Sequence, residues 1–403
     1  MSELGWREPG VLAYQRGHMH ERNLEGQPTQ TAVLLPSPLE GQAAALRTES
    51  LSASATPSAI SAVDDRLTAD HALRRIEAGE LLWYIGDYPN GRQLLSALRR
   101  RLAPRSSKPP RAADPLAIFR AERRQRAHEH RILSRLVVAV SREGAVYGKR
   151  VPDVAGAVHA ALGEREGWAL VPLQELLGMV GAAEWARKGV EVPGLEGRIH
   201  PVYGVFAPTR LEPAKLAARI PDVAGKAVLD VGTGTGVLAL LLLARGAASA
   251  VATDLDPRAV DCAAENARRL GLGDRLRVLM VDLFPAEGTF DVVVSNPPWL
   301  PEPPQTRLDG AIYDPDGRFV SGFLARLEQH LRPGGRGYLI LSDFAERLGL
   351  REPDDLRREA AASGLELREI AAERPAHPKA EDKSDPLQVL RAAERTRLFE
   401  LKV

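Results

Sequence analysis

The sequence of 403 residues is poor in cysteine, in long apolar runs and in secretion signals. Its single cysteine, Cys262, leaves no partner for an intrachain disulfide and is typical of a reducing compartment. The first residues lack the charged and then apolar pattern of a signal peptide. The longest apolar run, residues 237–244, ends at Arg245 and is too short to cross a bilayer. We therefore expect a cytoplasmic protein with no membrane contact.

An excess of charge of one sign is also lacking, because 54 basic and 53 acidic residues give a formal net charge of +1. Residues 99–135 are an exception, with twelve basic residues against the acids Asp114, Glu122 and Glu129. Such a segment could contact the phosphates of RNA or DNA, or it could be a solvated helical face that acids elsewhere balance. Both interpretations stay open. The basic residues are Arg99, Arg100, Arg101, Arg105, Lys108, Arg111, Arg120, Arg123, Arg124, Arg126, Arg131 and Arg135.

The chain divides into three parts by composition and periodicity. Residues 1–65 are rich in Ser, Ala, Pro, Gly and Gln, and we expect a disordered tail there. Residues 66–195 predict a mainly helical, basic domain, with an apolar run at 81–85 that is a strand or a buried turn and a strand at 136–140. The helices are expected at 68–78 with Thr68 as the cap, 91–102, 115–133, 154–162 and 171–188.

Residues 196–403 form the third part, in which strands and helices alternate from residue 226 onward. This alternation predicts an α/β fold with a mostly parallel sheet and helices on both faces. In such sheets the ligand crevice lies outside the carboxyl ends of the strands. The strands are expected at 227–231, 249–254, 277–281, 290–295, 337–342, 365–370 and 395–401, and the helices at 234–245, 257–270, 319–331 and 354–363.

A glycine-rich turn follows the first of these strands. Gly232, Thr233, Gly234 and Gly236 let the backbone turn tightly and approach a ligand, and the next helix offers free N–H groups. A dinucleotide-binding turn would need its third glycine one residue later, where Val237 stands. The alternative is a loop that binds S-adenosylmethionine, with an acid at the end of the preceding strand.

Acids stand at the ends of three successive strands. Asp230 can organise the glycine loop and lie near the methionine ammonium of S-adenosylmethionine. Asp254 suits two ribose hydroxyls, although a nicotinamide enzyme could use it as well. Asp282, with Leu283 beside it, can accept a hydrogen bond from the adenine amino group. Asp256 precedes Pro257 and is expected to cap a helix. Each acid alone could be a cap or a solvated loop residue, but their joint position favours S-adenosylmethionine as cofactor.

The fourth strand runs directly into Asn296, Pro297, Pro298 and Trp299. An amide or aromatic amine nitrogen is a poor nucleophile, and the Asn296 Oδ1 and the Pro297 carbonyl can both accept hydrogen bonds from an NH2 group and orient it. Trp299 can stack on a flat substrate and exclude water. The positive sulfonium drives the displacement, so we expect no metal. A proline-rich loop with Trp299 in the core is the alternative interpretation.

With these motifs, residues 200–345 resemble the class I methyltransferases, in the small-domain group that includes release-factor glutamine and adenine-N6 methyltransferases. The resemblance implies a Rossmann-like fold, a catalytic domain at 196–403, and a domain at 66–195 that recognises substrate or acts as a lid. Residues 203–209 resemble the segment that closes over the cofactor, but the Pro-Arg-Pro run of release-factor enzymes is missing. Residues 313–317 resemble their Asp-Gly segment, and Trp299 stands where the group often has Tyr or Phe.

The leading hypothesis is methyl transfer to a planar nitrogen of a macromolecule, either a nucleic-acid base amine or a protein glutamine. A small metabolite is an alternative acceptor. A protein that binds the cofactor or RNA without turnover is an alternative of another class, against which the intact motif at Asn296 stands. The sequence leaves the oligomeric state open.

Overall fold

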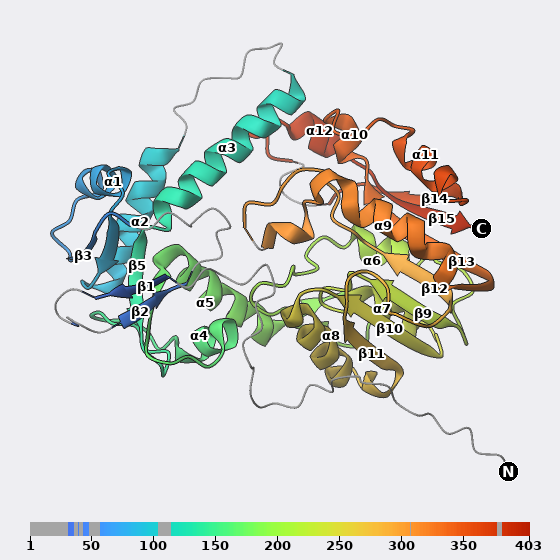
Figure 1. Ribbon diagram of the computed structural model, residues 1–403, viewed down its shortest axis with the longest axis horizontal. Coiled ribbons are helices and arrows are strands. Elements are labelled where there is room, and N and C mark those ends of the chain that lie inside the picture. Colours follow the sequence, from blue (N-terminus) through green and yellow to red (C-terminus); the bar gives the residue numbers. More distant parts are fainter. Residues whose placement is uncertain are drawn as a thin grey trace.

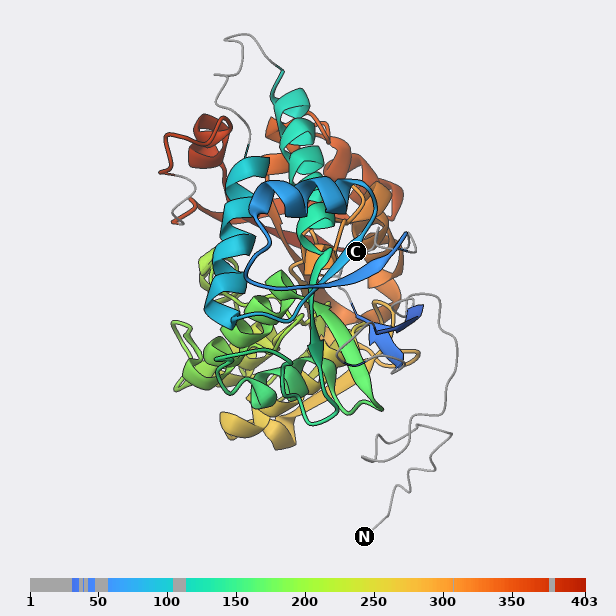
Figure 2. The same ribbon diagram turned by 90° about the vertical axis from the view of Figure 1, so that its left-hand side faces the viewer.

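The computed structural model describes residues 31–35, 39, 43–47, 57–103, 114–306, 308–376 and 381–403. They form two lobes, each built on a β-sheet, with the N-terminal lobe on the left of Figure 1 and the C-terminal lobe on the right. Figure 2 is turned so that the N-terminal lobe faces the reader. The long helix α3 (Pro115–Leu133) reaches from the first lobe to the second, where Phe119 packs edge-on against Phe344 with 6.4 Å between ring centroids.

The N-terminal lobe is a six-stranded sheet with helices on one face. Leu82, Leu136 and Val138 point from the sheet into a core shared with the helices, whereas Trp83 and Val137 point into a second cluster on the other face. The strand order is β1-β2-β6-β5-β4-β3. The elements are β1 (Thr31–Leu34), β2 (Ala43–Leu46), β3 (Ile60–Val63), α1 (Ala69–Glu77), β4 (Leu81–Tyr84), α2 (Tyr88–Leu102), α3, β5 (Leu136–Val140), α4 (Ala155–Leu162), β6 (Trp168–Pro172) and α5 (Leu173–Lys188).

This sheet corrects two predictions. Residues 1–65 are not a disordered tail in their described parts, because β1, β2 and β3 lie there and pair with other strands. The rest of that tail lies outside the described residues. The domain at 66–195 has the predicted helices, but they pack on a sheet, and residues 171–172, expected in a helix, end the strand β6. These four- and five-residue strands are stabilised by partners distant in the sequence, so local composition does not reveal them.

The predicted parallel sheet is confirmed in the C-terminal lobe. Seven strands follow the order β11-β10-β9-β12-β13-β15-β14, and β15 alone runs antiparallel to its neighbours. The strands are β9 (Ala227–Val231), β10 (Ser249–Asp254), β11 (Leu276–Met280), β12 (Phe290–Ser295), β13 (Leu331–Ser342), β14 (Glu366–Glu373) and β15 (Thr396–Lys402). A two-stranded hairpin of β7 (Val190–Glu191) and β8 (Arg198–Ile199) precedes them.

Helices cover both faces of this sheet, as expected. Alternate residues of β9 enter two separate cores: Val228 packs with α6 and α7, and Leu229 packs with α9 and α11. Both faces of the sheet are therefore buried under helices. A ligand can approach the sheet at the ends of its strands. The helices are α6 (Glu212–Ala217), α7 (Val237–Ala244), α8 (Pro257–Arg269), α9 (Arg318–Leu327), α10 (Phe344–Arg347), α11 (Asp355–Ala362) and α12 (Gln388–Ala393).

Candidate functional site

The glycine turn and the Asn296 motif leave the sheet side by side. Val231, the last residue of β9, pairs with Ser295, the last residue of β12, and accepts a hydrogen bond of 2.8 Å from the Ser295 hydroxyl. Gly232 and Asn296 therefore begin their loops from neighbouring strand ends. This is the convergence that the sequence predicted.

Positive φ angles shape the glycine turn. Gly232, Gly234 and Gly236 have φ angles of 72°, 56° and 83°, and the backbone N–H groups of Gly232 and Thr233 both donate to the Thr253 carbonyl at 2.9 Å. A β-carbon on Gly232 would stand 2.9 Å from the Phe319 ring, whereas one on Gly234 would meet no atom within 4 Å. The turn is therefore packed on one side and open at Gly234, where a ligand can approach the backbone.

Asp230 holds the turn to the following helix from a fully buried position. One oxygen, Oδ2, accepts from the Thr233 hydroxyl at 2.6 Å and from the Ala239 N–H at 3.1 Å. The other, Oδ1, has no hydrogen-bond partner among the described residues. Burial raises the pKa of Asp230 to about 6. A cationic ligand group at this carboxylate would supply the missing partner.

Asp254 is held at the end of β10 by the same turn. Its Oδ2 accepts from the Gly234 N–H at 2.9 Å and its Oδ1 from the Asp256 N–H at 3.0 Å. Burial raises the pKa of Asp254, and each oxygen keeps a lone pair for a hydroxyl donor. The next residue, Leu255, is 69% exposed, so an apolar surface adjoins the acid. The sequence analysis missed Leu255, although its place directly after the acid was a usable signal. Asp256 caps α8 as predicted and accepts from the Arg258 N–H.

The end of β11 differs from its neighbours. The Asp282 side chain is exposed and makes no hydrogen bond to the glycine turn. Leu283 has a φ angle of 60°, which is unusual for a branched residue. Its carbonyl accepts from the Thr253 hydroxyl at 2.5 Å, and this bond ties the strained residue to β10. Position and strain at residues 282–283 are consistent with a ligand contact.

The motif after β12 forms a compact corner. Asn296 and Trp299 are half-buried and Pro297 is buried. The Trp299 indole Nε1–H donates to Asn296 Oδ1 at 3.1 Å, and the Arg210 guanidinium lies 4.7 Å from the centre of the Trp299 ring. Sequence reasoning missed Arg210, which stands 89 positions before Trp299. Pro298 is half-buried beside them.

The segment after the motif, which runs from Leu300 to the start of α9, folds back and is held by contacts with α3. The Ile312 carbonyl accepts from the Trp299 N–H at 3.0 Å, and the Asp314 carboxylate accepts from the Phe319 N–H at the start of α9. At the tip of the segment, Glu302 pairs with Arg120 at 2.9 Å and with Arg123 at 3.3 Å. The N-terminal lobe thus holds the loop that carries the motif.

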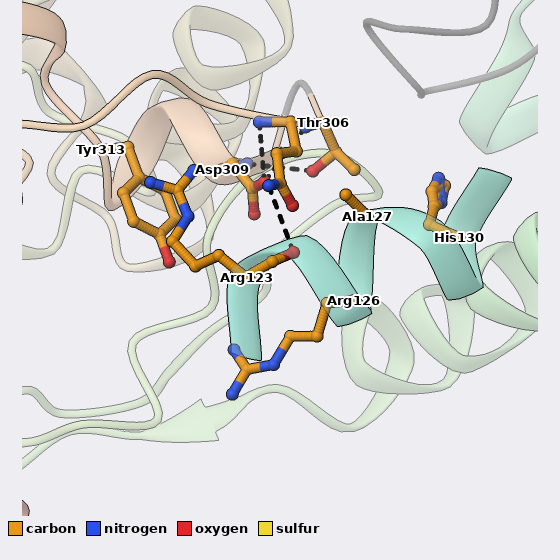
Figure 3. Close-up of a pocket in the computed structure, with 8 residues that line it drawn as sticks. Arg123, Arg126, Ala127, His130, Thr306, Asp309 and Tyr313 are labelled. Atoms are coloured by element: carbon orange, nitrogen blue, oxygen red, sulfur yellow. Dashed lines mark hydrogen bonds between the residues drawn. The ribbon is translucent and has the colours of Figure 1, made fainter. Parts of the chain in front are cut away.

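A cavity of about 140 Å³ lies between α3 and this segment (Figure 3). Arg123 is buried, its guanidinium lies 3.9 Å from the centre of the Tyr313 ring, and it donates to the Pro303 carbonyl. Burial lowers the pKa of His130 on the same helix. The cavity is lined by Arg123, Arg126, Ala127, His130, Gln305, Thr306, Asp309 and Tyr313.

In the described part of residues 99–135, several of the positive charges are neutralised by ion pairs with acids of the same segment or of other elements. Arg99 pairs with Glu129 at 3.2 Å, Arg101 with Asp70 at 2.6 Å, and Arg126 with Glu122 at 3.4 Å. Arg105, Lys108 and Arg111 lie outside the described residues. These pairs favour the interpretation of a solvated helical face balanced by acids.

The described residues hold no group of three or more His, Cys, Asp or Glu side chains placed to bind a metal ion. No helix within the described ranges is long and apolar enough to span a membrane. Cys262 is buried and burial raises the pKa of its thiol to about 11, which agrees with a packing role.

These features fit S-adenosylmethionine. The open side of Gly234 admits a ligand, the unpartnered Oδ1 of Asp230 suits an ammonium group, and Asp254 beside Leu255 combines hydroxyl acceptors with an apolar surface. Fold and site together therefore define a class I methyltransferase that depends on S-adenosylmethionine.

Comparison with known proteins agrees. The family model described as ribosomal protein L11 methyltransferase (PrmA) matches residues 216–297. The release factor glutamine methyltransferase of Cereibacter sphaeroides is 38% identical over 166 residues, which cover 37% of this chain and 60% of that protein. A candidate protein N5-glutamine methyltransferase of Methanocaldococcus jannaschii is 32% identical over 162 residues, which cover 38% of this chain and 80% of the relative. The chain belongs to the family of S-adenosylmethionine-dependent methyltransferases that includes this relative, and S-adenosylmethionine is its cofactor.

The match leaves parts of the relatives uncovered, since this chain spans 60% of the length of the C. sphaeroides protein. Among solved structures, the ribosomal protein L11 methylase of Lactobacillus delbrueckii subsp. bulgaricus has a TM-score of 0.33 and 19% identity, covering 47% of this chain and 75% of that one. That likeness is too low to support a conclusion about function.

Proposed function

We propose that this chain transfers a methyl group from S-adenosylmethionine to the side-chain amide nitrogen of a glutamine in a protein. The observation that carries the proposal is the register of β9 and β12, which brings Asn296 next to the glycine turn. The names of the C. sphaeroides and M. jannaschii relatives, both glutamine methyltransferases, support the choice of acceptor.

The chain's own groups explain how a poor nucleophile can react. Asn296 Oδ1 and the Pro297 carbonyl accept hydrogen bonds from the two N–H bonds of the acceptor amide and hold its nitrogen toward the methyl group. S-adenosylmethionine supplies a methyl group on a positively charged sulfur. A nitrogen–carbon bond forms as the carbon–sulfur bond breaks, and the nitrogen then loses one proton to solvent. Pro298 and Trp299 close the corner and exclude water.

The cofactor is assigned to the turn and to three strand ends. The backbone of the glycine turn contacts the cofactor and leaves room for it, at Gly232, Thr233, Gly234 and Gly236. Asp230 faces the ammonium of the methionine part. Asp254 binds the ribose hydroxyls. Asp282 and Leu283 take the adenine edge, and Leu255 packs against the ring. The exposure of Asp282 leaves its carboxylate free for this contact.

The domain at 66–195 is assigned to acceptor recognition. Its helix α3 holds the segment after the motif through Arg120 and Arg123, so an acceptor bound between the lobes would touch both the motif and the recognition surface. A nucleic-acid base amine is the second candidate acceptor, favoured by the remaining exposed arginines of residues 99–135.

The test is transfer of labelled methyl from S-adenosylmethionine into lysate fractions of cells that lack the protein. We expect label in protein, released as N-methylglutamine after complete proteolysis. Label in RNA or DNA would move the proposal to a base amine, and label in small molecules would contradict a macromolecular acceptor. Heat-treated enzyme is the control for transfer by other methyltransferases in the lysate.

A further inference from the structure

A chain of contacts leads from the end of β13, the strand beside β12, to Asn296. The Ser342 hydroxyl, at the end of β13, donates to Glu394 Oε1 at 2.7 Å, and the same oxygen accepts from Arg210 Nη2 at 2.9 Å. The Arg210 guanidinium lies over the Trp299 ring, and the Trp299 indole donates to Asn296. The order of contacts is thus Ser342, Glu394, Arg210, Trp299 and Asn296.

Arg210 is well anchored in this chain. Glu394 and Glu212 are 3% and 2% exposed, and Arg210 Nη2 lies 2.9 Å from the first and 3.6 Å from the second. Glu212 also accepts from the Ala376 N–H at 3.0 Å, so its carboxylate is fixed independently. Two buried carboxylates hold the guanidinium in place, and a cation over an indole face is attractive in itself.

The last contact decides the orientation of the Asn296 amide. An indole N–H can only donate a hydrogen bond, and an asparagine side chain has one acceptor end and one donor end. The 3.1 Å bond therefore requires Oδ1, not Nδ2, beside Trp299. Oδ1 has two lone pairs, so the second remains for an N–H of the acceptor.

We propose that Arg210 is a positioning residue for the acceptor: it fixes the Trp299 indole, whose N–H locks the Asn296 amide with Oδ1 available to the acceptor nitrogen. The inference rests on the proposed function for the identity of the acceptor group. The series of contacts from Ser342 to Asn296, however, is a property of the protein structure alone. A Tyr or Phe ring at position 299 has no indole N–H, so this lock depends on the Trp that stands here.

The first test is independent of activity. In a two-dimensional 1H–15N spectrum of the full chain, the Trp299 indole signal is the one lost in Trp299→Phe, among the five tryptophans. Arg210→Gln should shift that signal and speed its exchange with solvent by at least about fivefold, as expected for a lost hydrogen bond. Asn296→Ala should have the same effect. An unchanged Trp299 signal in Arg210→Gln would overturn the inference.

The matched control is Arg397→Gln. Arg397 also lies over an aromatic ring, 5.0 Å from the centre of Phe399, and pairs with a glutamate, Glu346, and its side chain is 15% exposed. It lies on β15, opposite Leu341 of β13, and is not one of the residues of the contact chain. A shift of the Trp299 signal in this variant as large as in Arg210→Gln would show a general loss of stability and contradict the positioning role.

The second test uses whichever acceptor the wild-type chain methylates. Arg210→Gln and Trp299→Phe should each lower kcat by about tenfold, with unchanged Kd for S-adenosylhomocysteine, and the double variant should be no slower than the slower single one. Arg210→Lys, which keeps the charge, should recover part of the rate. Additive losses would contradict a single contact chain. If the wild type methylates nothing, the proposed function fails while the spectral test still decides this inference.

Discussion

At the scale of single residues, the glycine turn offers a matched pair of substitutions. Gly234 and Gly271 have φ angles of 56° and 67°, and a β-carbon on either would meet no atom within 4 Å. Alanine at either position should therefore cost a similar backbone strain, about 1 kcal/mol. Only Gly234→Ala should weaken binding of S-adenosylhomocysteine, by at least about tenfold, because its methyl group would enter the cofactor space. Titration calorimetry with both variants checks this, and equal affinities would refute the assigned cofactor position.

The Asp230 carboxyl predicts how cofactor binding depends on pH. Its pKa is raised to about 6 by burial, and the ammonium of the cofactor requires the ionised form. Below that pH the free protein must first lose a proton, so affinity should be highest above pH 6 and fall by up to about tenfold per pH unit below it. The raised pKa of Asp254 acts in the same direction.

Calorimetric titration of S-adenosylhomocysteine from pH 7.5 to pH 5 measures this dependence, with Asp230→Asn expected to flatten most of it. A wild-type affinity that does not change over that range would contradict the role of Asp230.

Local sequence predicted the residues of the turn and motif but not their partners. Asp230 and Asp254 lie at the ends of strands and Asn296 directly follows one, and the ends of these strands are expected at the crevice. Arg210 could not, because its contact with Trp299 depends on how a loop outside the sheet returns over the motif. The sequence placed Leu283 at the site because it stands beside Asp282 at the end of a predicted strand. Its positive φ angle is visible only in the structure.

At the scale of elements, α3 and the segment after the motif act as one unit. The Arg123 side chain is 7% exposed and contacts Glu302 and the Tyr313 ring. Arg123→Gln would leave Glu302 with one partner fewer in a buried setting, so the free energy of unfolding should fall by about 3 kcal/mol. Methyl transfer should fall as well, with S-adenosylhomocysteine affinity unchanged, because the cofactor turn is held separately.

Chemical denaturation and calorimetry measure both effects. Arg124→Gln, one position along the same helix and exposed, is the control and should change stability by no more than about 0.5 kcal/mol. If Arg123→Gln weakened cofactor binding as much as transfer, the segment would not act on the acceptor side alone.

The central strands of the C-terminal lobe, β9, β10 and β12, were predictable because they are largely buried and alternate with helices, whereas the short elements β7, β8, α6, α10 and α12 were not predicted. Helix α3 has the bounds that the sequence predicted, and the structure adds that Asp114 caps it by accepting from the Leu116 N–H. The strands β1, β2, β3 and β6 were missed because each has only four or five residues and pairs with strands distant in the sequence. Local propensity carries no information about such partners.

At the scale of the whole molecule, the basic segment separates the two macromolecular acceptors. Arg100 and Arg124 are exposed and make no ion pair with the carboxylates of the described residues. If a protein is the acceptor, the double variant Arg100→Gln with Arg124→Gln should keep the wild-type transfer rate and its dependence on salt. If a nucleic acid is the acceptor, the double variant should bind it more weakly whatever its base sequence. The slope of log K against log salt concentration should then decrease in magnitude by about two.

At the centre of the proposed function, Asn296 presents an acceptor nitrogen to a cofactor held at the end of the neighbouring strand β9. The most direct measurement is a side-by-side comparison of wild type and Asn296→Ala for transfer of labelled methyl and for binding of S-adenosylhomocysteine. We predict that the variant binds S-adenosylhomocysteine with wild-type affinity and loses transfer by at least about a hundredfold, because an oriented hydrogen-bond acceptor at the reacting nitrogen is removed. Transfer by Asn296→Ala at the wild-type rate would contradict the account.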